Sequence, residues 1–162
     1  MNLPVRPTTD QAKEGLFNIL YHMWDFDGLE VLDLFAGTGA VSYEFASRGA
    51  AKVTCVDKNH SCTSFIAETK AKLGLPQVNP IRDDAFRFIE RNQNTYDIIF
   101  ADPPYDLQGI DTLPDKILSK AILREEGNFI LEHPSDYDFS THPGFEKLKK
   151  YSRVHFSFFK RG

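Results

Sequence analysis

Residues 30–39 read Glu-Val-Leu-Asp-Leu-Phe-Ala-Gly-Thr-Gly, and this stretch decides the fold. The apolar run at its start is typical of a buried strand, and Gly37 and Gly39 allow the sharp turn that leads into a helix. That helix is predicted over residues 40–48, and a second strand follows at residues 52–57. A strand, a glycine turn, a helix and another strand form the repeating unit of a parallel sheet.

The alternation of strands and helices continues along the rest of the chain. Further strands are predicted at residues 78–82, 96–101, 128–132, 145–151 and 153–160, the last two forming a hairpin. Further helices are predicted at residues 60–73, 84–92 and 112–124. We therefore expect a doubly wound α/β fold with helices on both faces of a mostly parallel sheet, and an antiparallel strand from the C-terminal hairpin.

One more helix, at residues 9–24, is predicted ahead of the first strand. Its apolar residues recur at helical spacing and form one stripe: Ala12, Leu16, Ile19, Leu20 and Met23. Thr8 and Gln11 fit a capping box, which predicts Thr8 as the N-cap residue of this helix. The length suits one domain, so we expect residues 1–162 to form a single domain with residues 1–28 as a helical lead-in.

The composition, with 41% hydrophobic and 26% charged residues, is that of an ordinary soluble globular protein. No run of about 18 apolar residues is present, and the N-terminus lacks the apolar core of a signal peptide. Cys55 and Cys62 have no partner spacing for a disulfide framework or a zinc site, and the five histidines are scattered. We therefore expect a cytoplasmic protein with reduced thiols, no metal and no membrane contact, and a monomer.

The charge is distributed unevenly along the chain. Residues 145–162 carry six lysines and arginines against Glu146, a net charge of +5, although the whole chain carries −4. A basic end on an acidic body is one form of electrostatic footprint for phosphates. The alternative is a pair of solvated strands whose lysines simply face water, and the run alone favours that alternative.

The acid before the glycine turn points to the kind of ligand. Open α/β sheets bind ligands where Asp33, Gly37 and Gly39 stand, at the end of the first strand. A dinucleotide-binding loop would carry a third glycine where Ser42 stands, and a pyrophosphate would not favour the Asp33 carboxylate. A cationic ligand would favour a neighbouring carboxylate, and S-adenosylmethionine carries both a sulfonium and an ammonium group. A purely structural turn is the alternative.

Two further acids follow the next two strands. Asp57 ends the second strand, where a carboxylate can accept hydrogen bonds from both ribose hydroxyls of a nucleoside. Asp83-Asp84-Ala85 follows the third strand, where a carboxylate can accept the amino protons of an adenine. The alternatives are an exposed strand-end acid for Asp57 and a helix cap for Asp83.

The most specific feature is Asp102-Pro103-Pro104-Tyr105, directly after the apolar strand at residues 96–101. An exocyclic base amine is a poor nucleophile because its lone pair is conjugated into the ring. The Asp102 carboxylate and the Pro103 carbonyl, fixed by two prolines, can accept both amine protons and favour tetrahedral geometry. Tyr105 offers a flat face on which an extruded base can stack. These residues predict a catalytic site for a conjugated amine.

The glycine loop and the Asp102–Tyr105 block together resemble the amino-methyltransferase superfamily of Rossmann-like methyltransferases. Arg6-Pro7-Thr8-Thr9-Asp10, followed by Glu14-Gly15-Leu16-Phe17-Asn18-Ile19-Leu20, is similar to bacterial 16S ribosomal RNA guanine-N2 methyltransferases of the RsmD type. The resemblance runs from Arg6 to about Val154. It implies a seven-stranded sheet, S-adenosylmethionine as donor, S-adenosylhomocysteine as product, and a guanine held by Asp102–Tyr105.

The resemblance also implies further contacts with the donor and with the RNA. It places Arg6 and Thr8 over the methionine end of the donor, and it places Phe35 and Ala85 beside the donor. Members of this family usually carry a basic, glycine-containing segment before this block, and only five residues precede Arg6 here. RNA contacts would then come from another surface, such as residues 145–162, and the substrate would be ribosomal RNA within a small-subunit particle.

Two other functions stay open at this point. A DNA methyltransferase acting on adenine N6 or cytosine N4 would use the same Asp102–Tyr105 block, because all these targets present a conjugated amine. Against it, 162 residues leave no room for an added target-recognition domain. A non-catalytic donor-binding scaffold is the second alternative, and it would have no chemical need of Asp102 and Tyr105.

Overall fold

The computed structural model describes residues 9–161, which form a seven-stranded sheet with the strand order β3-β2-β1-β4-β5-β7-β6. The strands are β1 (Glu30–Leu34), β2 (Lys52–Asp57), β3 (Val78–Arg82), β4 (Tyr96–Ala101), β5 (Leu123–His133), β6 (Phe145–Tyr151) and β7 (Val154–Phe159). Strands β1 to β5 pair in parallel, and β7 lies antiparallel between β5 and β6. The predicted doubly wound sheet is therefore confirmed.

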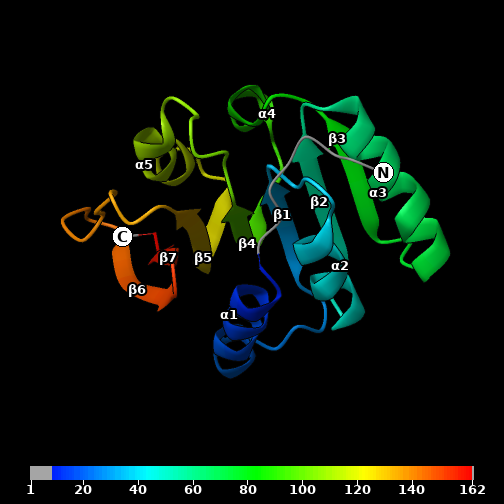
Figure 1. Ribbon diagram of the computed structural model, residues 1–162, viewed down its shortest axis with the longest axis horizontal. Helices are drawn as coiled ribbons and strands as arrows, with labels where there is room; N and C mark the ends of the chain where they lie inside the picture. Colours follow the sequence, from blue (N-terminus) through cyan, green and yellow to red (C-terminus); the bar gives the residue numbers. More distant parts are fainter. Residues whose placement is uncertain (1–8, 162) are drawn as a thin grey trace.

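Helices cover both faces of this sheet (Figure 1). They are α1 (Asp10–Met23), α2 (Ala40–Ser47), α3 (His60–Leu73), α4 (Ala85–Arg91), the 3-10 turn η1 (Ile110–Thr112) and α5 (Leu113–Ser119). One buried cluster joins α1, α2 and α3 to one face, and a second joins α4, η1 and α5 to the other. The strand order reverses between β1 and β4, and that switch point is where folds of this kind bind ligands. Among the described residues, no helix is long and apolar enough to cross a membrane.

Helix α1 begins one residue later than the capping-box prediction placed it. Thr9, rather than Thr8, is the N-cap residue, and its hydroxyl accepts a hydrogen bond from the Ala12 backbone N–H at 3.2 Å. The predicted apolar stripe is correct, because Ala12, Leu16 and Leu20 are fully buried. Thr8 itself lies outside the described residues.

The helix predicted over residues 112–124 is too long. Helix α5 ends at Ser119, and β5 already begins at Leu123. The Arg124 guanidinium explains the difference, because it forms ion pairs with Glu30 at 2.7 Å and with Asp97 at 2.9 Å. These tertiary contacts hold the segment in the sheet beside β4, where local helical periodicity no longer decides its conformation.

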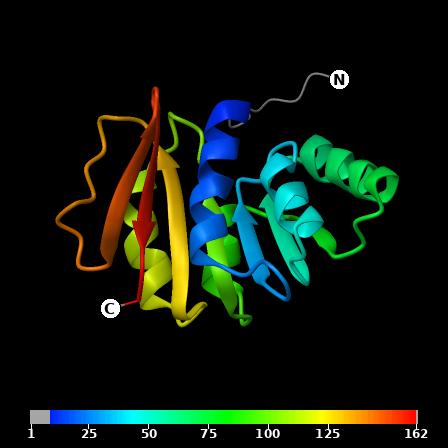
Figure 2. The same ribbon diagram turned by 90° about the horizontal axis from the view of Figure 1, so that it is seen from below.

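The C-terminal hairpin is confirmed, and its turn lies at the edge of the sheet where the parallel strands end. His133, the last residue of β5, pairs with His155, and His155 pairs with Lys150 near the end of β6. Figure 2 shows the arrowhead of β5 and the turn between β6 and β7 at the same edge of the molecule. The turn therefore shares this edge with the residues that follow β1, β2, β3 and β4.

Candidate active site

A cavity of about 430 Å³ lies at the carboxyl ends of β1, β2, β3 and β4. Its size is within the usual range for a small-molecule site. The predicted site residues that line it are Asp33, Phe35, Gly37, Asp57, Asp84, Ala85, Asp102, Pro103, Pro104 and Tyr105. Arg6 and Thr8 lie outside the described residues. The structure thus brings together residues that stand up to 72 positions apart in the sequence.

The glycine loop is built by backbone conformations that ordinary residues rarely adopt. Gly37 and Gly39 have φ angles of 57° and 84°, and Phe35 has a φ of 59° although it is not a glycine. Phe35 lines the cavity from this conformation, and its ring lies 6.5 Å from that of Phe86. Left-handed conformations in non-glycine residues cost about 1–3 kcal/mol and gather at functional sites. The unusual conformation of Phe35 at the cavity wall marks this loop as a candidate ligand-binding segment.

Gly39 has a structural role at the start of α2. It does not line the cavity, and it is the N-cap residue of α2. A Cβ atom on Gly39 would lie 2.6 Å from the Tyr43 hydroxyl oxygen and 3.0 Å from an Ile66 carbon. These neighbouring side chains and the left-handed φ favour glycine at this position, and the role of Gly39 in donor binding stays a prediction.

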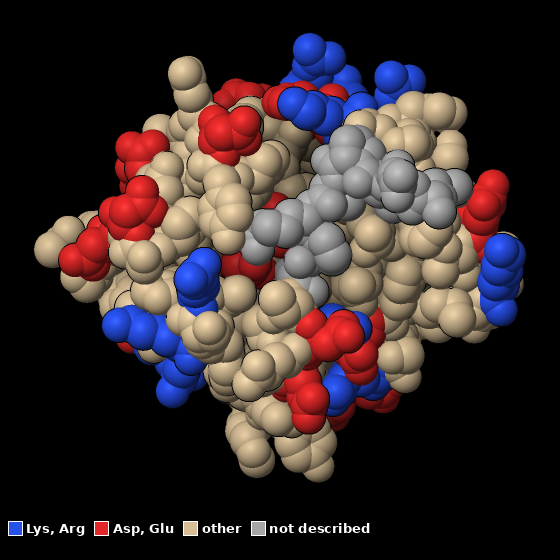
Figure 3. All heavy atoms as spheres, in the orientation of Figure 1, with Lys and Arg blue, Asp and Glu red and all other residues tan. Residues whose placement is uncertain are grey.

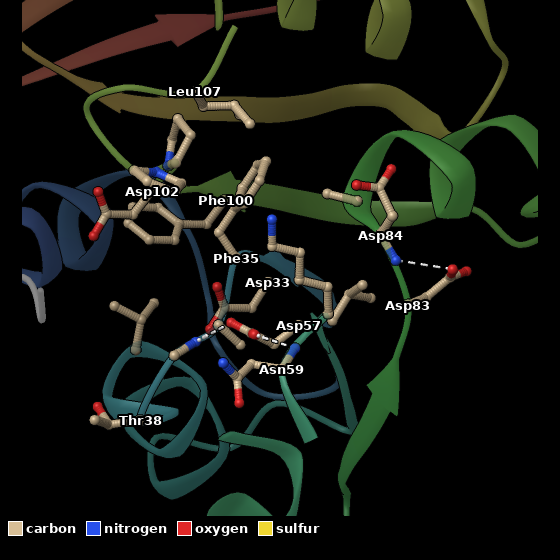
Figure 4. A pocket seen from close by; sticks show the side chains of 18 of the residues that line it. Asp33, Phe35, Thr38, Asp57, Asn59, Asp83, Asp84, Phe100, Asp102 and Leu107 are labelled. Carbon is tan, nitrogen blue, oxygen red and sulfur yellow. Dashed lines mark hydrogen bonds between the residues drawn. The ribbon is translucent and has the colours of Figure 1, made fainter. Parts of the chain in front are cut away.

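The Asp57 carboxylate is held in place by two backbone donors. Its Oδ2 accepts a hydrogen bond from the Gly37 N–H at 3.0 Å, and its Oδ1 accepts one from the Asn59 N–H at 2.9 Å (Figure 4). Each carboxylate oxygen has a further lone pair, so these bonds leave capacity for two ligand hydroxyls. Asp57 therefore links the glycine loop to the start of α3 and faces the cavity in a fixed orientation.

Asp33 is almost fully buried, with 2% of its surface exposed. Its Oδ2 accepts a hydrogen bond from the Ser42 hydroxyl at 2.7 Å. Burial raises the pKa of Asp33 to about 7, and the nearby carboxylates of Asp57 and Glu132 act in the same direction against the Ser42 bond. Near neutral pH this carboxyl group is poised to ionise beside a positive charge.

The acids after β3 divide their roles differently from the prediction. Asp84, rather than Asp83, caps α4 by accepting the Arg87 N–H at 3.0 Å. Asp83 is buried, accepts the Asp84 N–H at 2.9 Å and forms an ion pair with Arg91 at 2.8 Å. Asp84 also lines the cavity beside Ala85, so one side chain both caps a helix and faces the cavity.

The Asp102–Tyr105 block forms the other end of the cavity, directly after β4. Pro103 is buried, and the Pro104 carbonyl accepts the Leu107 N–H at 3.1 Å, which closes the turn. The Tyr105 side chain is 54% exposed. In Figure 4, Asp102 and Asp84 lie on opposite sides of the cavity, with Phe35 and Asp57 between them. The predicted acceptor block and the predicted nucleoside-binding acids thus share one space.

Sequence reasoning missed several residues that line the cavity: Thr38, Ala40, Val41, Val56, Lys58, Asn59, Phe100, Asp106 and Leu107. It also missed Glu132, a buried acid at the end of β5 that raises the pKa of Asp33. The sequence did offer a signal for Glu132. It is an acid near the end of an apolar strand, as Asp33 and Asp57 are. Six aspartates and one lysine of the described residues line the cavity, which suits a ligand with positive charge.

The fold and this site define a Rossmann-like methyltransferase. The family model described as conserved hypothetical protein 95 matches residues 2–160, and the chain belongs to that family.

Among its relatives is the ribosomal RNA small subunit methyltransferase D of Buchnera aphidicola (subsp. Baizongia pistaciae), 27% identical over 96% of this chain and 81% of the relative. The methyltransferase D of Escherichia coli K12 is 32% identical over 62% of this chain and 50% of its own length. The fold is shared with the T. thermophilus 16S rRNA N2 G1207 methyltransferase RsmC, solved with AdoMet and guanosine, at a TM-score of 0.77 and 21% identity. That match covers 99% of this chain and 45% of RsmC.

Proposed function

We propose that this protein transfers a methyl group from S-adenosylmethionine to the exocyclic N2 amine of a guanine in small-subunit (16S) ribosomal RNA. The observation that carries the proposal is the position of Asp102–Tyr105 in the same cavity as Asp33, Asp57 and Asp84. The names of the Buchnera and E. coli relatives support small-subunit ribosomal RNA as the substrate. The resemblance of residues 6–20 to guanine-N2 enzymes supports the choice of base.

The residues of the cavity fit the donor group by group. Asp57 can accept two ribose hydroxyls, and Asp84 lies where it can accept the amino protons of an adenine. Asp33, whose ionisation is favoured by a nearby cation, suits the charged methionine end. When bound, the donor supplies an electrophilic methyl group on its sulfonium.

The chain's own part in the reaction is to hold and orient the target amine. The Asp102 carboxylate and the Pro103 carbonyl accept the two amine protons, which reduces conjugation with the ring and turns the lone pair toward the donor. The Asp102 carboxylate is also the nearest base of this block for the proton that the amine loses. Tyr105, largely exposed at the mouth, stacks on the extruded base and keeps it out of its helix.

We place this activity in the cytoplasm, with a monomer acting on a small-subunit particle. A particle can present the target base already exposed, which lowers the energy needed to unstack it. Adenine N6 or cytosine N4 in DNA remains the rival substrate, because the Asp102–Tyr105 acceptors would hold any conjugated amine. A donor-binding scaffold is disfavoured by the complete acceptor block within the cavity.

Mass spectrometry of nucleosides from small-subunit RNA tests the proposal in cells that lack the gene. The expected result is the loss of one N2-methylguanosine. Expression of the unaltered chain should restore it, Asp102→Ala should not, and Asp111→Ala should, because Asp111 is exposed on η1 and does not line the cavity. Nucleosides from the DNA of the same cells test the rival. A full complement of N2-methylguanosine in the RNA, together with a loss of N6-methyladenine or N4-methylcytosine from the DNA, would support it.

A further inference from the structure

The basic residues near the C-terminus do not form one uniform patch, because three of them have structural partners. Lys160 forms an ion pair with Glu146 at 3.0 Å, and Arg161 donates to the Leu123 carbonyl at 3.1 Å. The Lys147 ammonium lies 5.1 Å from the centre of the Phe158 ring. The contacts of these three cations stabilise the hairpin and its attachment to the sheet.

The other three cations are Lys149, Lys150 and Arg153, which we call the basic tip. All three are exposed, and within residues 9–161 their side chains form no ion pair or hydrogen bond. Lys149 and Lys150 are neighbours near the end of β6, so they point to opposite faces of the strand, and Arg153 lies in the turn before β7. The basic tip therefore presents positive charge on both faces of the hairpin and at its end.

The sheet register places the basic tip level with the catalytic block. Ala101, which precedes Asp102, pairs with Leu131 of β5, and Leu131 pairs with Ser157 of β7. Ser157 in turn pairs with Leu148 of β6, and Lys149 and Lys150 are the next two residues toward this edge. Strands lie about 4.8 Å apart, so β7 and β6 are roughly 10 and 14 Å from β4. Figure 3, which views this edge, shows lysines and arginines gathered over the hairpin, beside the central hollow.

We propose that the basic tip binds the sugar-phosphate backbone of the RNA strand that carries the target base. This inference rests on the proposed function for the identity of the nucleic acid. A separation of 10–14 Å corresponds to about three to four nucleotides along a stacked strand, at roughly 3.4 Å each. The contacted phosphates thus lie about three to four nucleotides from the base held by Asp102 and Tyr105.

The net negative charge of the chain as a whole makes the basic tip a favourable place for an anionic polymer. The whole chain carries a net charge of −4, and six aspartates line the cavity. An RNA strand is therefore repelled by most of the body and attracted at the basic tip, which orients it before the base enters. Lysine and arginine side chains that bind phosphates release counterions, so such binding weakens as salt is added.

A salt titration of RNA binding tests the basic tip directly. The probes are deproteinised small-subunit RNA and undermethylated small-subunit particles, and the variants are Lys149→Gln/Lys150→Gln and Arg153→Gln. Each lost contact lowers the magnitude of the slope of log affinity against log salt by about 0.7–0.9. If the affinities are equal at 1 M salt, one lost contact therefore weakens binding about 5- to 8-fold at 0.1 M salt. The double variant should therefore bind about 25- to 60-fold more weakly at 0.1 M salt.

The matched control is Lys52→Gln/Lys72→Gln, which removes two exposed lysines from the start of β2 and the end of α3, at the opposite edge of the sheet. It should leave the slope unchanged, and both double variants should keep normal donor affinity and normal kcat at saturating RNA. Suppose that a basic-tip variant keeps the salt slope of the unaltered chain while guanine is still methylated. That result would contradict RNA binding by the basic tip and would leave the proposed function intact. If the unaltered chain binds neither probe in a salt-dependent way, the basic tip and the proposed substrate both fail.

Discussion

Asp33 makes donor binding depend on pH in a way that can be calculated. Its pKa of about 7 in the ligand-free chain means that it is about nine-tenths protonated at pH 6, half protonated at pH 7 and one-tenth protonated at pH 8. A cationic donor beside it stabilises the carboxylate, so binding should release roughly 0.9, 0.5 and 0.1 proton at these three pH values. Donor affinity should rise up to about tenfold per pH unit below pH 7 and level off above pH 8.

The stability of the ligand-free chain should change in the opposite direction. The pKa of Asp33 is raised on folding from 3.8 to about 7, so the folded state holds a proton that the unfolded state has lost. The contribution of Asp33 to stability is therefore complete below about pH 4 and is lost as the pH rises through about 7. Saturating donor should reduce this loss.

Isothermal titration calorimetry in two buffers of different ionisation enthalpy measures the released protons. Asp33→Asn should abolish the release, and Ser42→Ala should shift it to higher pH, because the Ser42 hydroxyl donates a hydrogen bond to the carboxylate at 2.7 Å. Heats at pH 6 that are independent of the buffer, or proton release that survives Asp33→Asn, would refute this reasoning.

Three further substitutions have distinct expected outcomes. Asp102→Ala should slow single-turnover methyl transfer about 10²–10³-fold with little change in donor Kd, since one fixed acceptor for the amine is lost; full turnover would remove Asp102 from the reaction. Tyr105→Ala should raise the KM for RNA by an amount that corresponds to about 1–3 kcal/mol of lost stacking. Tyr105→Phe should leave KM unchanged, because stacking needs only the ring, and equal losses in the two variants would argue against stacking. Gly39→Ala should lower the Tm by roughly 2–12 °C, because its φ is 84° and its Cβ would lie 2.6 Å from the Tyr43 hydroxyl oxygen. With Tyr43→Ala, which removes the two side-chain atoms that the Cβ would meet at 2.6 and 2.7 Å, the Tm loss caused by Gly39→Ala should be smaller, and an unchanged loss would mean that this contact is not responsible.

Much of the fold could be predicted because apolar strands and glycine turns are local patterns. The strand at residues 52–57 and the helix at residues 60–73 have the predicted bounds, since Gly74 takes the left-handed conformation that ends α3. The segment around Arg124 could not be predicted, because its partners Glu30 and Asp97 are distant in the sequence. Ion pairs between residues on three different strands produce no hydrophobic periodicity that could be recognised in the sequence.

The candidate site shows the same division. Asp57 and Asp102 were predicted because acids at the carboxyl ends of β2 and β4, the two strands that flank β1, lie at one edge of a parallel sheet. The structural role of Gly39 could not be predicted, because the direction of a missing Cβ depends on the positions of Tyr43 and Ile66. Glu132 was missed, because its importance arises from its effect on Asp33, which only the folded sheet brings near.

The central claim is that the cavity and the Asp102–Tyr105 block together methylate guanine N2 in small-subunit RNA. The most direct measurement incubates the purified chain with undermethylated small-subunit particles and isotope-labelled S-adenosylmethionine, followed by nucleoside mass spectrometry. The predicted result is label in N2-methylguanosine, present with the unaltered chain and absent with Asp102→Ala. Label in N6-methyladenosine or N4-methylcytidine, or no label in any nucleoside, would contradict the claim.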